Sequence, residues 1–514
     1  SMKSVSMKVV GSGRRLARGR RLLSVGRGQY GPVGDAESQW FERLLGSKYA
    51  IRRAEDPELL RCHSTDWTRR WEPKEADVSP LLLFPGTEQE VAACVQYCAE
   101  HRIPIVPQGG NTGLVGGSTP SQPGQVILGL ARLNKVVSID EEEGILHCEA
   151  GCILEHLQQF VGQRGFEMPV DLGAKGSCQI GGNLATNAGG IRFVRHGSLR
   201  SSVLMLRAID GRGQILEMGT RMRKDNTGYD TKQFFIGSEG TLGVITSAVL
   251  TLPRLPVDRQ TALLAVGSFD SAASLAFAAK NILGETLSAI EWLDTAAMRH
   301  VLSHFSPEHV TTPFSSDTAQ CNFLLVEAAG ARAEHDREKL EHFLEWALEA
   351  DLGISDAVLA HDGKQTANLW AIREGCPVAL TGAGLVCYKY DISLPIRTFD
   401  SVISATKARL ADRRVAAEVV CWGHLGDGNL HINVATKHHN PAVEEALEPW
   451  LFEVVNAAGG SISAEHGVGR CKQKYMELIK GAQALRLMQE LKTVFDPHAI
   501  MNPGIMMPPV SPQA

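Results

Sequence analysis

The chain has 514 residues, a hydrophobic content of 44%, a charged content of 21% and a formal net charge of -5. This length predicts two or three domains, because single cores stop growing at roughly 250–300 residues. No apolar run approaches the ~18 residues that span a bilayer, so we expect no integral membrane segment. The acidic balance argues against nucleic acid as a partner. The 11 cysteines lack any Cys-x-x-Cys pair, which indicates reduced, mostly buried thiols.

Residues 1–34 form a basic leader with no acid before Asp35. An Arg-rich, Ser-containing, acid-free segment is typical of a mitochondrial transit peptide, and a disordered basic tail is the alternative. The leader contains Gly26-x-Gly28-x-x-Gly31, a formal dinucleotide fingerprint. No strand precedes it and no amphipathic helix follows, so we treat it as a chance match. Residues 35–75 are expected to be helical.

A βαβ unit is predicted from residue 81 onward. Leu81–Phe84 and Ile103–Val106 have the apolar pattern of buried strands. Between them, Thr87-x-x-Glu90 is a capping box that opens a helix, with Val91, Cys94, Val95 and Cys98 at helical spacing. The two strands should therefore be parallel.

Three segments rich in small residues follow: Pro107–Ser118, Asp171–Gly190 and Gly237–Thr246. Such loops allow close backbone approach and can present consecutive N–H groups to anionic oxygens. The first lacks the Lys-Ser/Thr of a Walker loop, and the strand expected at Val126–Leu130 follows it rather than a helix, unlike a Rossmann phosphate loop. Each alone could simply connect strands. Three together, each expected between strands, suggest one long phosphate-bearing cofactor across a sheet edge.

A second sheet is expected after a linker. Pro253, Pro256 and the polar run Val257–Gln260 predict the linker, and the alternation in Thr261–Phe269 predicts the first strand of the new sheet.

The run from His424 to His431 predicts a β-hairpin, because two short apolar strands flank an Asp-Gly turn. With the loop at Gly426–Asn429, the two histidines lie opposite each other with Cβ atoms ~5 Å apart. This arrangement suits two imidazoles on one divalent ion, and Asn433 points to the same side. Two surface histidines are the alternative, and the spacing alone does not decide.

These motifs carry a family resemblance. Pro107–Gly117, Gly181–Asn183 and Gly237–Gly243 resemble the FAD-binding domain of the vanillyl-alcohol oxidase flavoprotein superfamily. The hairpin and Ala464–Gly469 resemble the C-terminal domain of its FAD-linked D-2-hydroxyacid dehydrogenases. Tyr388–Pro395 is most similar to the members that act on D-2-hydroxyglutarate. The resemblance runs from about residue 75 to the end.

The resemblance implies an α+β architecture. It comprises a two-subdomain FAD-binding domain at 76–256, an antiparallel-sheet substrate domain at 257–460, and a C-terminal helical segment at 461–514 that closes on the flavin. FAD is expected to contact these residues: Pro107, Gly109, Gly110, Asn111, Thr112, Gly113, Gly116, Gly117, Ser118, Gly173, Ser177, Cys178, Gly181, Gly182, Asn183, Thr186, Asn187, Gly189, Gly190, Glu239, Gly240, Gly243, Ile245 and Asn502.

The implied oxidation of a hydroxyacid needs an electrophile, a general base and cationic side chains that bind the substrate carboxylates. We expect Zn²⁺, with Mn²⁺ or Co²⁺ also allowed by ligand type, on His424, His431 and Glu465. His466 is the candidate general base, because an imidazole pKa of about 6.5 suits proton removal near neutrality; a purely structural histidine is the alternative. The substrate-binding residues are expected to be Arg373 and Lys389, which bind carboxylates, together with Asn433 and His466.

The expected reaction is oxidation of D-2-hydroxyglutarate to 2-oxoglutarate, with hydride transfer to flavin N5. The resemblance implies the mitochondrial matrix as location and an electron-transfer flavoprotein as acceptor; a homodimer is the candidate assembly. One departure affects the substrate. Relatives should carry a Thr one turn after the arginine, whereas this chain reads Arg373-Glu-Gly-Cys-Pro377. D-lactate or another D-2-hydroxyacid is therefore the alternative substrate, and a zinc hydrolase or a non-catalytic flavin scaffold are alternatives of other classes.

Overall fold

The computed structural model describes residues 30–315, 318 and 320–508. The leader predicted at 1–34 lies almost entirely outside these residues, as does most of the fingerprint discarded at Gly26–Gly31. Residues 35–75 were expected to be helical, and α1 (Asp35–Leu45) and α2 (Pro57–Ser64) lie there, but a short strand, β1 (Ala50–Arg52), lies between them. Asp56 caps α2, its carboxylate accepting from Leu59 N at 2.9 Å.

A four-stranded sheet has the strand order β1-β2-β4-β3. Its strands are β1 (Ala50–Arg52), β2 (Leu81–Leu83), β3 (Ile105–Gln108) and β4 (Val126–Gly129). The predicted helix is α3 (Glu88–Glu100), and Thr87 Oγ1 accepts from Glu90 N at 3.1 Å. β2 and β3 both run parallel to β4, which lies between them. The predicted unit is thus parallel, but its two strands are not neighbours.

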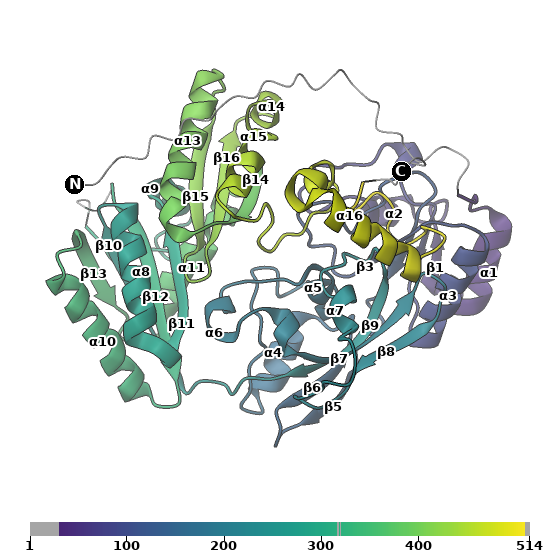
Figure 1. The fold of residues 1–514 in the computed structure, drawn as a ribbon, viewed down its shortest axis with the longest axis horizontal. Helices are drawn as coiled ribbons and strands as arrows, with labels where there is room; N and C mark the ends of the chain where they lie inside the picture. Colours follow the sequence, from purple (N-terminus) through teal and green to yellow (C-terminus); the bar gives the residue numbers. More distant parts are fainter. Residues whose placement is uncertain (1–29, 316–317, 319, 509–514) are drawn as a thin grey trace.

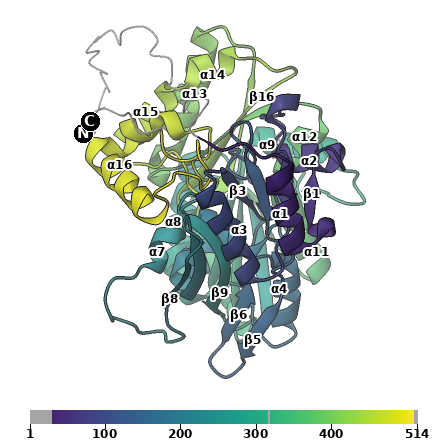
Figure 2. The same ribbon diagram turned by 90° about the vertical axis from the view of Figure 1, so that its right-hand side faces the viewer.

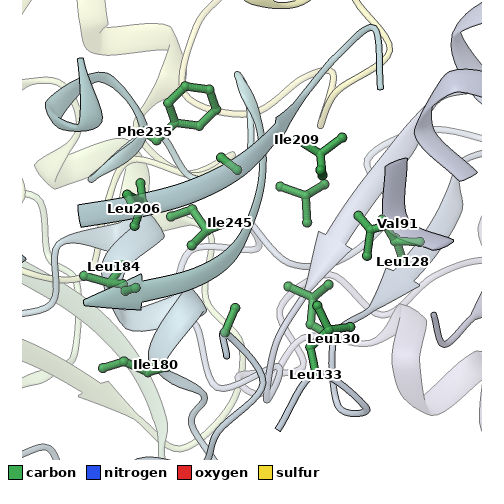
Figure 3. Close-up of a cluster of buried hydrophobic side chains, with 14 of the residues drawn as sticks. Val91, Leu128, Leu130, Leu133, Ile180, Leu184, Leu206, Ile209, Phe235 and Ile245 are labelled. Atoms are coloured by element: carbon green, nitrogen blue, oxygen red, sulfur yellow. The ribbon is translucent and has the colours of Figure 1, made fainter. Parts of the chain in front are cut away.

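A five-stranded antiparallel sheet, in the order β5-β6-β9-β7-β8, shares one hydrophobic core with the first (Figure 3). Its strands are β5 (Val136–Asp140), β6 (Ile145–Glu149), β7 (Val203–Asp210), β8 (Ile215–Gly219) and β9 (Gly243–Thr251). The helices here are α4 (Leu154–Gly162), α5 (Ile180–Thr186), α6 (Phe193–His196) and α7 (Lys232–Phe235). One expectation was wrong, because the Gly-Gly-Asn stretch of the second segment lies in α5 and not in a loop between strands.

A seven-stranded antiparallel sheet, in the order β13-β10-β12-β11-β15-β16-β14, forms the second lobe (Figure 1). Its strands are β10 (Asp258–Val266), β11 (Leu287–Leu293), β12 (Asn322–Gly330), β13 (Ile354–Leu359), β14 (Val386–Ser393), β15 (Glu418–His424) and β16 (Asn429–Thr436).

Each face of this sheet has its own core. Helices α8 (Phe269–Leu283), α10 (Ala333–Glu349) and α13 (Phe399–Asp412) cover one face. Helices α9 (Thr295–His304), α11 (Gly363–Glu374) and α12 (Cys376–Gly382) cover part of the other. The uncovered part of this second face, on β14, β15 and β16, lines the cavity described below.

The chain ends with α14 (Ala442–Leu447), α15 (Trp450–Ala457) and α16 (Met476–Phe495), which is kinked at Gly481. Beyond α16 the chain returns to the first lobe, where Met501 forms a parallel bridge to Ile105 of β3. The perpendicular view shows α16 on the opposite side of that lobe from α1 (Figure 2). No helix within the described part of the chain is long and apolar enough to cross a bilayer. The predicted α+β fold class is confirmed.

Candidate active site

A cavity of about 630 Å³ lies where the three small-residue segments meet the seven-stranded sheet. All the predicted metal and substrate residues line it. Of the predicted FAD residues, all but three line it as well. The cavity thus joins residues more than 350 positions apart in the chain, such as Gly110 and His466.

The three exceptions are Gly116, Asn187 and Asn502. Gly116 lies beneath Trp71, whose ring would be 2.8 Å from an added Cβ. Asn187 has a left-handed φ of 49° at the end of α5 and accepts from Arg200 N at 3.1 Å. Asn502 Nδ2 donates to Gly117 O and to Glu239 O, each at 2.8 Å, so it joins two of the small-residue loops from behind.

The cavity walls fit a large ligand held by backbone groups. Gln179 Oε1 and Asn183 Oδ1 are buried without a hydrogen-bond partner among the described residues, and both residues line the cavity. Buried polar atoms are nearly always paired, so these two indicate a missing donor. An added Cβ at Gly173 or Gly182 would meet nothing within 4 Å, which leaves open space against the backbone. These features fit FAD.

The two predicted histidines lie on one face of the hairpin, but the predicted register was wrong. The turn is Leu425–Gly428, and Asn429 already belongs to β16. Trp422, not His424, pairs with His431. The shift is two residues, and because strand side chains alternate with a period of two, both imidazoles keep the same face. Their ring centroids are 5.4 Å apart.

Glu465 completes a three-ligand arrangement. Its Oε1 lies 3.6 Å from His424 Nε2 and 3.5 Å from His431 Nε2. A tetrahedral ion with ligand bonds of ~2.1 Å separates its ligand atoms by ~3.4 Å, so these spacings fit a single divalent ion. The other carboxylate oxygen accepts from Gly190 N at 2.8 Å, which links this residue to the second small-residue segment.

Two further carboxylates orient the imidazoles from behind. Glu291 on β11 accepts from His424 Nδ1, with oxygens at 2.8 and 2.9 Å. Asp391 on β14 lies 3.7 Å from His431 Nδ1. One oxygen of Asp391 accepts three backbone N–H groups, those of residues 464–466, at 2.9–3.0 Å. Asp391 belongs, with His431, Glu465 and His466, to a group whose ligand atoms lie within 4.8 Å of one another, and this group does not include His424. Both oxygens of Asp391 already accept hydrogen bonds, from Asn429 Nδ2 and from the backbone, so we assign its charge to supporting the imidazoles rather than to metal binding.

The charges of the cluster follow from burial and pairing. Burial lowers the pKa of His424, but Glu291 and Glu465 outweigh it and hold that pKa well above its usual value. Burial dominates at His431 and lowers its pKa to about 3. For Glu465, burial raises the pKa, but the two imidazoles outweigh it and lower the value to about 2. Without metal, the cluster therefore holds a charged His424 against a charged Glu465.

His466 stacks on His431, with ring centroids 5.5 Å apart and planes at 21°. Its Nδ1 faces Asp391 at 3.9 Å. With Nδ1 turned to this carboxylate, Nε2 is the nitrogen available to a substrate. Burial lowers the pKa of His466 below its usual value despite the neighbouring carboxylates, so the imidazole is a neutral proton acceptor near pH 7.

Two cations line the same cavity. Arg373 is 5% exposed, and its Nη2 lies 2.8 Å from Glu291 Oε2. The pair lacks hydrogen-bond alignment, so Nε and Nη2 of Arg373 have no acceptor among the described residues. Lys389 pairs with Asn433 across β14 and β16, and burial lowers the pKa of its ammonium. A buried guanidinium with free N–H groups and an ammonium on one cavity wall can hold carboxylates.

Comparison with known proteins identifies the family. Residues 79–219 match the FAD binding domain family, and residues 255–506 match the family of FAD linked oxidases, C-terminal domain. The mitochondrial D-2-hydroxyglutarate dehydrogenase of Arabidopsis thaliana is 43% identical over 480 residues, 93% of this chain and 83% of the relative. That of Bos taurus is 44% identical over 453 residues, 88% of this chain and 80% of the relative. The chain belongs to the D-2-hydroxyglutarate dehydrogenase family of FAD-linked oxidases.

The comparisons confirm the predicted vanillyl-alcohol oxidase-type fold. The 4-ethylphenol oxidase of Gulosibacter chungangensis has a TM-score of 0.73 at 16% identity, and the match covers 93% of this chain and 99% of the oxidase. At that identity the likeness shows the fold alone. The family membership and the FAD-binding match show that the protein is an FAD-dependent dehydrogenase.

The sequence reasoning missed both orienting carboxylates of this dehydrogenase. A signal existed for Glu291, which is the only charged residue in the fully buried strand Leu287–Leu293. A carboxylate inside such a strand must be paired. Asp391 lies within Tyr388–Pro395, which served above only as a family motif, whereas in the structure it accepts from backbone N–H groups and faces His431 and His466.

Proposed function

We propose that the protein oxidises D-2-hydroxyglutarate to 2-oxoglutarate in an FAD- and divalent-metal-dependent reaction. The observation that carries the metal dependence is the placement of Glu465 Oε1 within 3.6 Å of both His424 Nε2 and His431 Nε2, inside the cavity that the small-residue segments line. The three small-residue segments would hold the flavin, which would supply a hydride acceptor at N5. His424, His431 and Glu465 would hold the divalent ion, which would supply an electrophile for the C2 hydroxyl.

His466 is the proposed general base. Its imidazole is neutral near pH 7, because burial lowers its pKa. Its Nδ1 lies 3.9 Å from the Asp391 carboxylate, so Nε2 is the nitrogen proposed to take the hydroxyl proton. The same carboxylate lies 3.7 Å from His431 Nδ1, so one buried negative charge faces both the base and a metal ligand. The nearby negative charge also stabilises the imidazolium that proton transfer creates.

The proposed substrate class rests on the two cations. Arg373 offers unpaired N–H groups beside Glu291 and the histidines, which supports binding of the carboxylate next to the reacting carbon. Lys389 lies farther along β14, opposite Asn433, which supports binding of a second carboxylate. Pro377 and Val378 line the cavity one turn after the arginine, where a Thr was expected, so this part of the wall is apolar. We propose a dicarboxylate whose methylene groups contact this wall.

The relatives named above are described as mitochondrial, which supports import of this protein into mitochondria. We propose the matrix as its location and an electron-transfer flavoprotein as its electron acceptor. Fusion of residues 1–34 to a fluorescent protein tests the leader, and a diffuse cytosolic signal would contradict it.

Mixing the reduced enzyme with electron-transfer flavoprotein tests the acceptor, whose own flavin spectrum should bleach. A homodimer is likewise proposed, and sedimentation of the holoenzyme tests it.

Anaerobic reduction of the bound flavin tests the reaction. D-2-hydroxyglutarate should bleach the visible flavin spectrum faster than D-malate or D-lactate, and prior treatment with a chelator should abolish the bleaching. Faster reduction by D-lactate would assign the alternative substrate. Equal rates after confirmed metal removal would contradict the metal role. Flavin that no hydroxyacid reduces would favour a scaffold, and a protein without a yellow chromophore would overturn the flavoenzyme assignment.

The substitution Lys389→Ala tests whether this lysine binds the second substrate carboxylate. A hydrogen bond to a charged group contributes about 1.5–3 kcal/mol, so the ratio of kcat/KM for D-2-hydroxyglutarate to that for D-lactate should fall about 10- to 150-fold. Lys437→Ala is the matched control, because this exposed lysine follows the end of β16 and does not line the cavity. Equal losses for both substrates would show that Lys389 does not bind the distal carboxylate.

A further inference from the structure

A turn from the N-terminal part of the chain lies at the cavity, and Trp67 belongs to it. The turn is organised by Asp66, which is 2% exposed and accepts from Thr68 N and from Trp71 N, each at 3.0 Å. Two backbone N–H groups on one buried carboxylate fix the local conformation. The sequence motifs described above assign nothing to this segment.

The turn is tied to both lobes. Thr65 O accepts from Asn111 Nδ2 of the first small-residue loop at 2.9 Å. Arg70 forms an ion pair with Glu444 of α14, in the other lobe, and its Nη1 lies 3.6 Å from Cys471 Sγ in the C-terminal segment. The turn is therefore an anchored bridge across the cavity, and not a free flap.

Trp67 is 55% exposed, although a large indole gains free energy from burial, and it lines the cavity. The Lys389 Nζ lies 5.1 Å from the centroid of its ring. Within residues 30–315, 318 and 320–508, Lys389 forms no ion pair with a carboxylate, so the indole face is the charge-stabilising contact that the structure gives it.

The position of this pair along the sheet matters. Lys389 is two residues from Asp391 on β14, and the two face Asn433 and His431 on β16. Two residues along a strand span about 7 Å, with both side chains on the same face. Along β14, the direction from Asp391 to Lys389 therefore leads from the imidazole cluster, where C2 of a substrate would react, toward Trp67. The length is comparable with the carbon chain of a five-carbon dicarboxylate.

An indole face stabilises an ammonium without neutralising it. Unlike a carboxylate partner, it therefore leaves the charge and the N–H donors of Lys389 free for an incoming anion. It also covers one side of the ammonium from water, which strengthens the attraction between opposite charges.

We propose that Trp67 is a specificity-determining residue, which holds the Lys389 ammonium against its ring and so directs it at the distal carboxylate of a D-2-hydroxy dicarboxylate. The inference rests on the proposed function, since it names how the same site selects among D-2-hydroxyacids. Trp67 lies against Lys389, so its effect should be confined to the end of the substrate remote from the reacting carbon.

The test is steady-state kinetics of holoenzyme variants with D-2-hydroxyglutarate and with D-lactate, which lacks the distal carboxylate. Trp67→Leu should raise KM for D-2-hydroxyglutarate about 2- to 30-fold more than KM for D-lactate, the range that a cation–π contact spans. Trp67→Phe, which keeps a weaker aromatic face, should give a smaller change. Because more than half of the indole is exposed, both variants should fold.

Two controls separate this role from a structural one. Trp71→Phe alters the neighbouring indole on the same turn, which contacts Gly116, and should leave the ratio of the two KM values unchanged. In a Lys389→Met background, Trp67→Leu should cause no further change in that ratio, because the contact is already lost.

Equal effects of Trp67→Leu on both substrates, or undiminished effects in the Lys389→Met background, would overturn the inference and assign Trp67 to covering the cavity. Failure of the proposed function looks different, because the wild-type flavin would then not be reduced by D-2-hydroxyglutarate at all. Fluorescence provides a second readout. Binding of 2-oxoglutarate should change the emission of the wild-type protein more than that of Trp67→Phe, and identical changes would count against the inference.

Discussion

Replacing Glu291 by Gln should weaken metal binding without touching a metal ligand. Glu291 is 1% exposed, and both its oxygens lie within 2.9 Å of His424 Nδ1, while one also lies 2.8 Å from Arg373 Nη2. Glutamine keeps the shape but removes the charge and one acceptor. The amide oxygen would then be the one acceptor left for His424 Nδ1, and the amide N–H groups would face the Arg373 cation.

The magnitude follows from the role of a carboxylate behind a histidine ligand. Such a group fixes the ring and raises the basicity of the ligating nitrogen, and its loss costs about 10- to 100-fold in metal affinity. The assay is competition between the metal-free protein and a chromophoric chelator, with Zn²⁺ as the metal. The flavin absorbance of each variant confirms that the protein is folded and loaded.

A matched control is available on β15. Glu418 also accepts a histidine N–H, from His300 Nε2 at 2.9 Å, but it lies away from the cavity and its side chain is 38% exposed. Glu418→Gln should leave the Zn²⁺ affinity unchanged. If Glu291→Gln binds Zn²⁺ within about twofold of wild type, then His424 is not held as a ligand by this carboxylate, and the three-residue metal site is wrong.

Three further predictions test the base, the cofactor space and the protonation of the site. His466→Asn should lower kcat about 10²- to 10⁴-fold at unchanged Zn²⁺ and FAD content, measured by steady-state kinetics; a loss of metal instead would make the residue a ligand. Gly182→Ala should fold normally but retain less FAD, because its Cβ meets no protein atom within 4 Å and would occupy the cofactor space. Gly110→Ala should be unstable even without FAD, because its Cβ would lie 2.0 Å from Ser177 O. Calorimetry of the flavin-free variants separates the two effects. Without metal, the raised pKa of His424 keeps its imidazole protonated, while Glu465 is already ionised. Because Zn²⁺ must displace this one proton, the Zn²⁺ affinity should rise about tenfold from pH 6 to pH 7. An affinity that does not change with pH would show that the imidazole is neutral.

Local patterns were enough for most of the elements around the site. Thr87 does cap α3, although Glu90 Oε2 accepts from Gly86 N and not from Thr87 N, so the predicted capping box is only half formed. The alternation after residue 260 does lie in the first strand of a new sheet, but β10 begins at Asp258, so the predicted linker was too long. The hairpin was recognised with the wrong register, yet the histidines were assigned to the correct relative face, because a slip of two residues preserves the side of a strand. A slip of one would have separated them.

The second small-residue segment shows the limit of such patterns. Glycines at Gly181 and Gly182 favour a loop by propensity, but they lie in α5, where an added Cβ at Gly181 would be 2.5 Å from Ala150 Cβ. The close approach of two backbone segments requires glycine there, and a helix accommodates it. Propensity cannot distinguish a glycine that makes a turn from one that permits close packing.

The sequence by itself determined which chemical groups this protein has: the small-residue segments, the two hairpin histidines, and the Glu465-His466 pair. These are local features, because each depends on residues within one turn or one strand pair. Only the tertiary structure decided which side chains pack against these groups. Glu291, Asp391 and Trp67 come from three separate elements, and their partners lie from 40 to more than 300 positions away in the chain. No local pattern encodes such pairings, because they arise when distant strands and turns pack around one cavity.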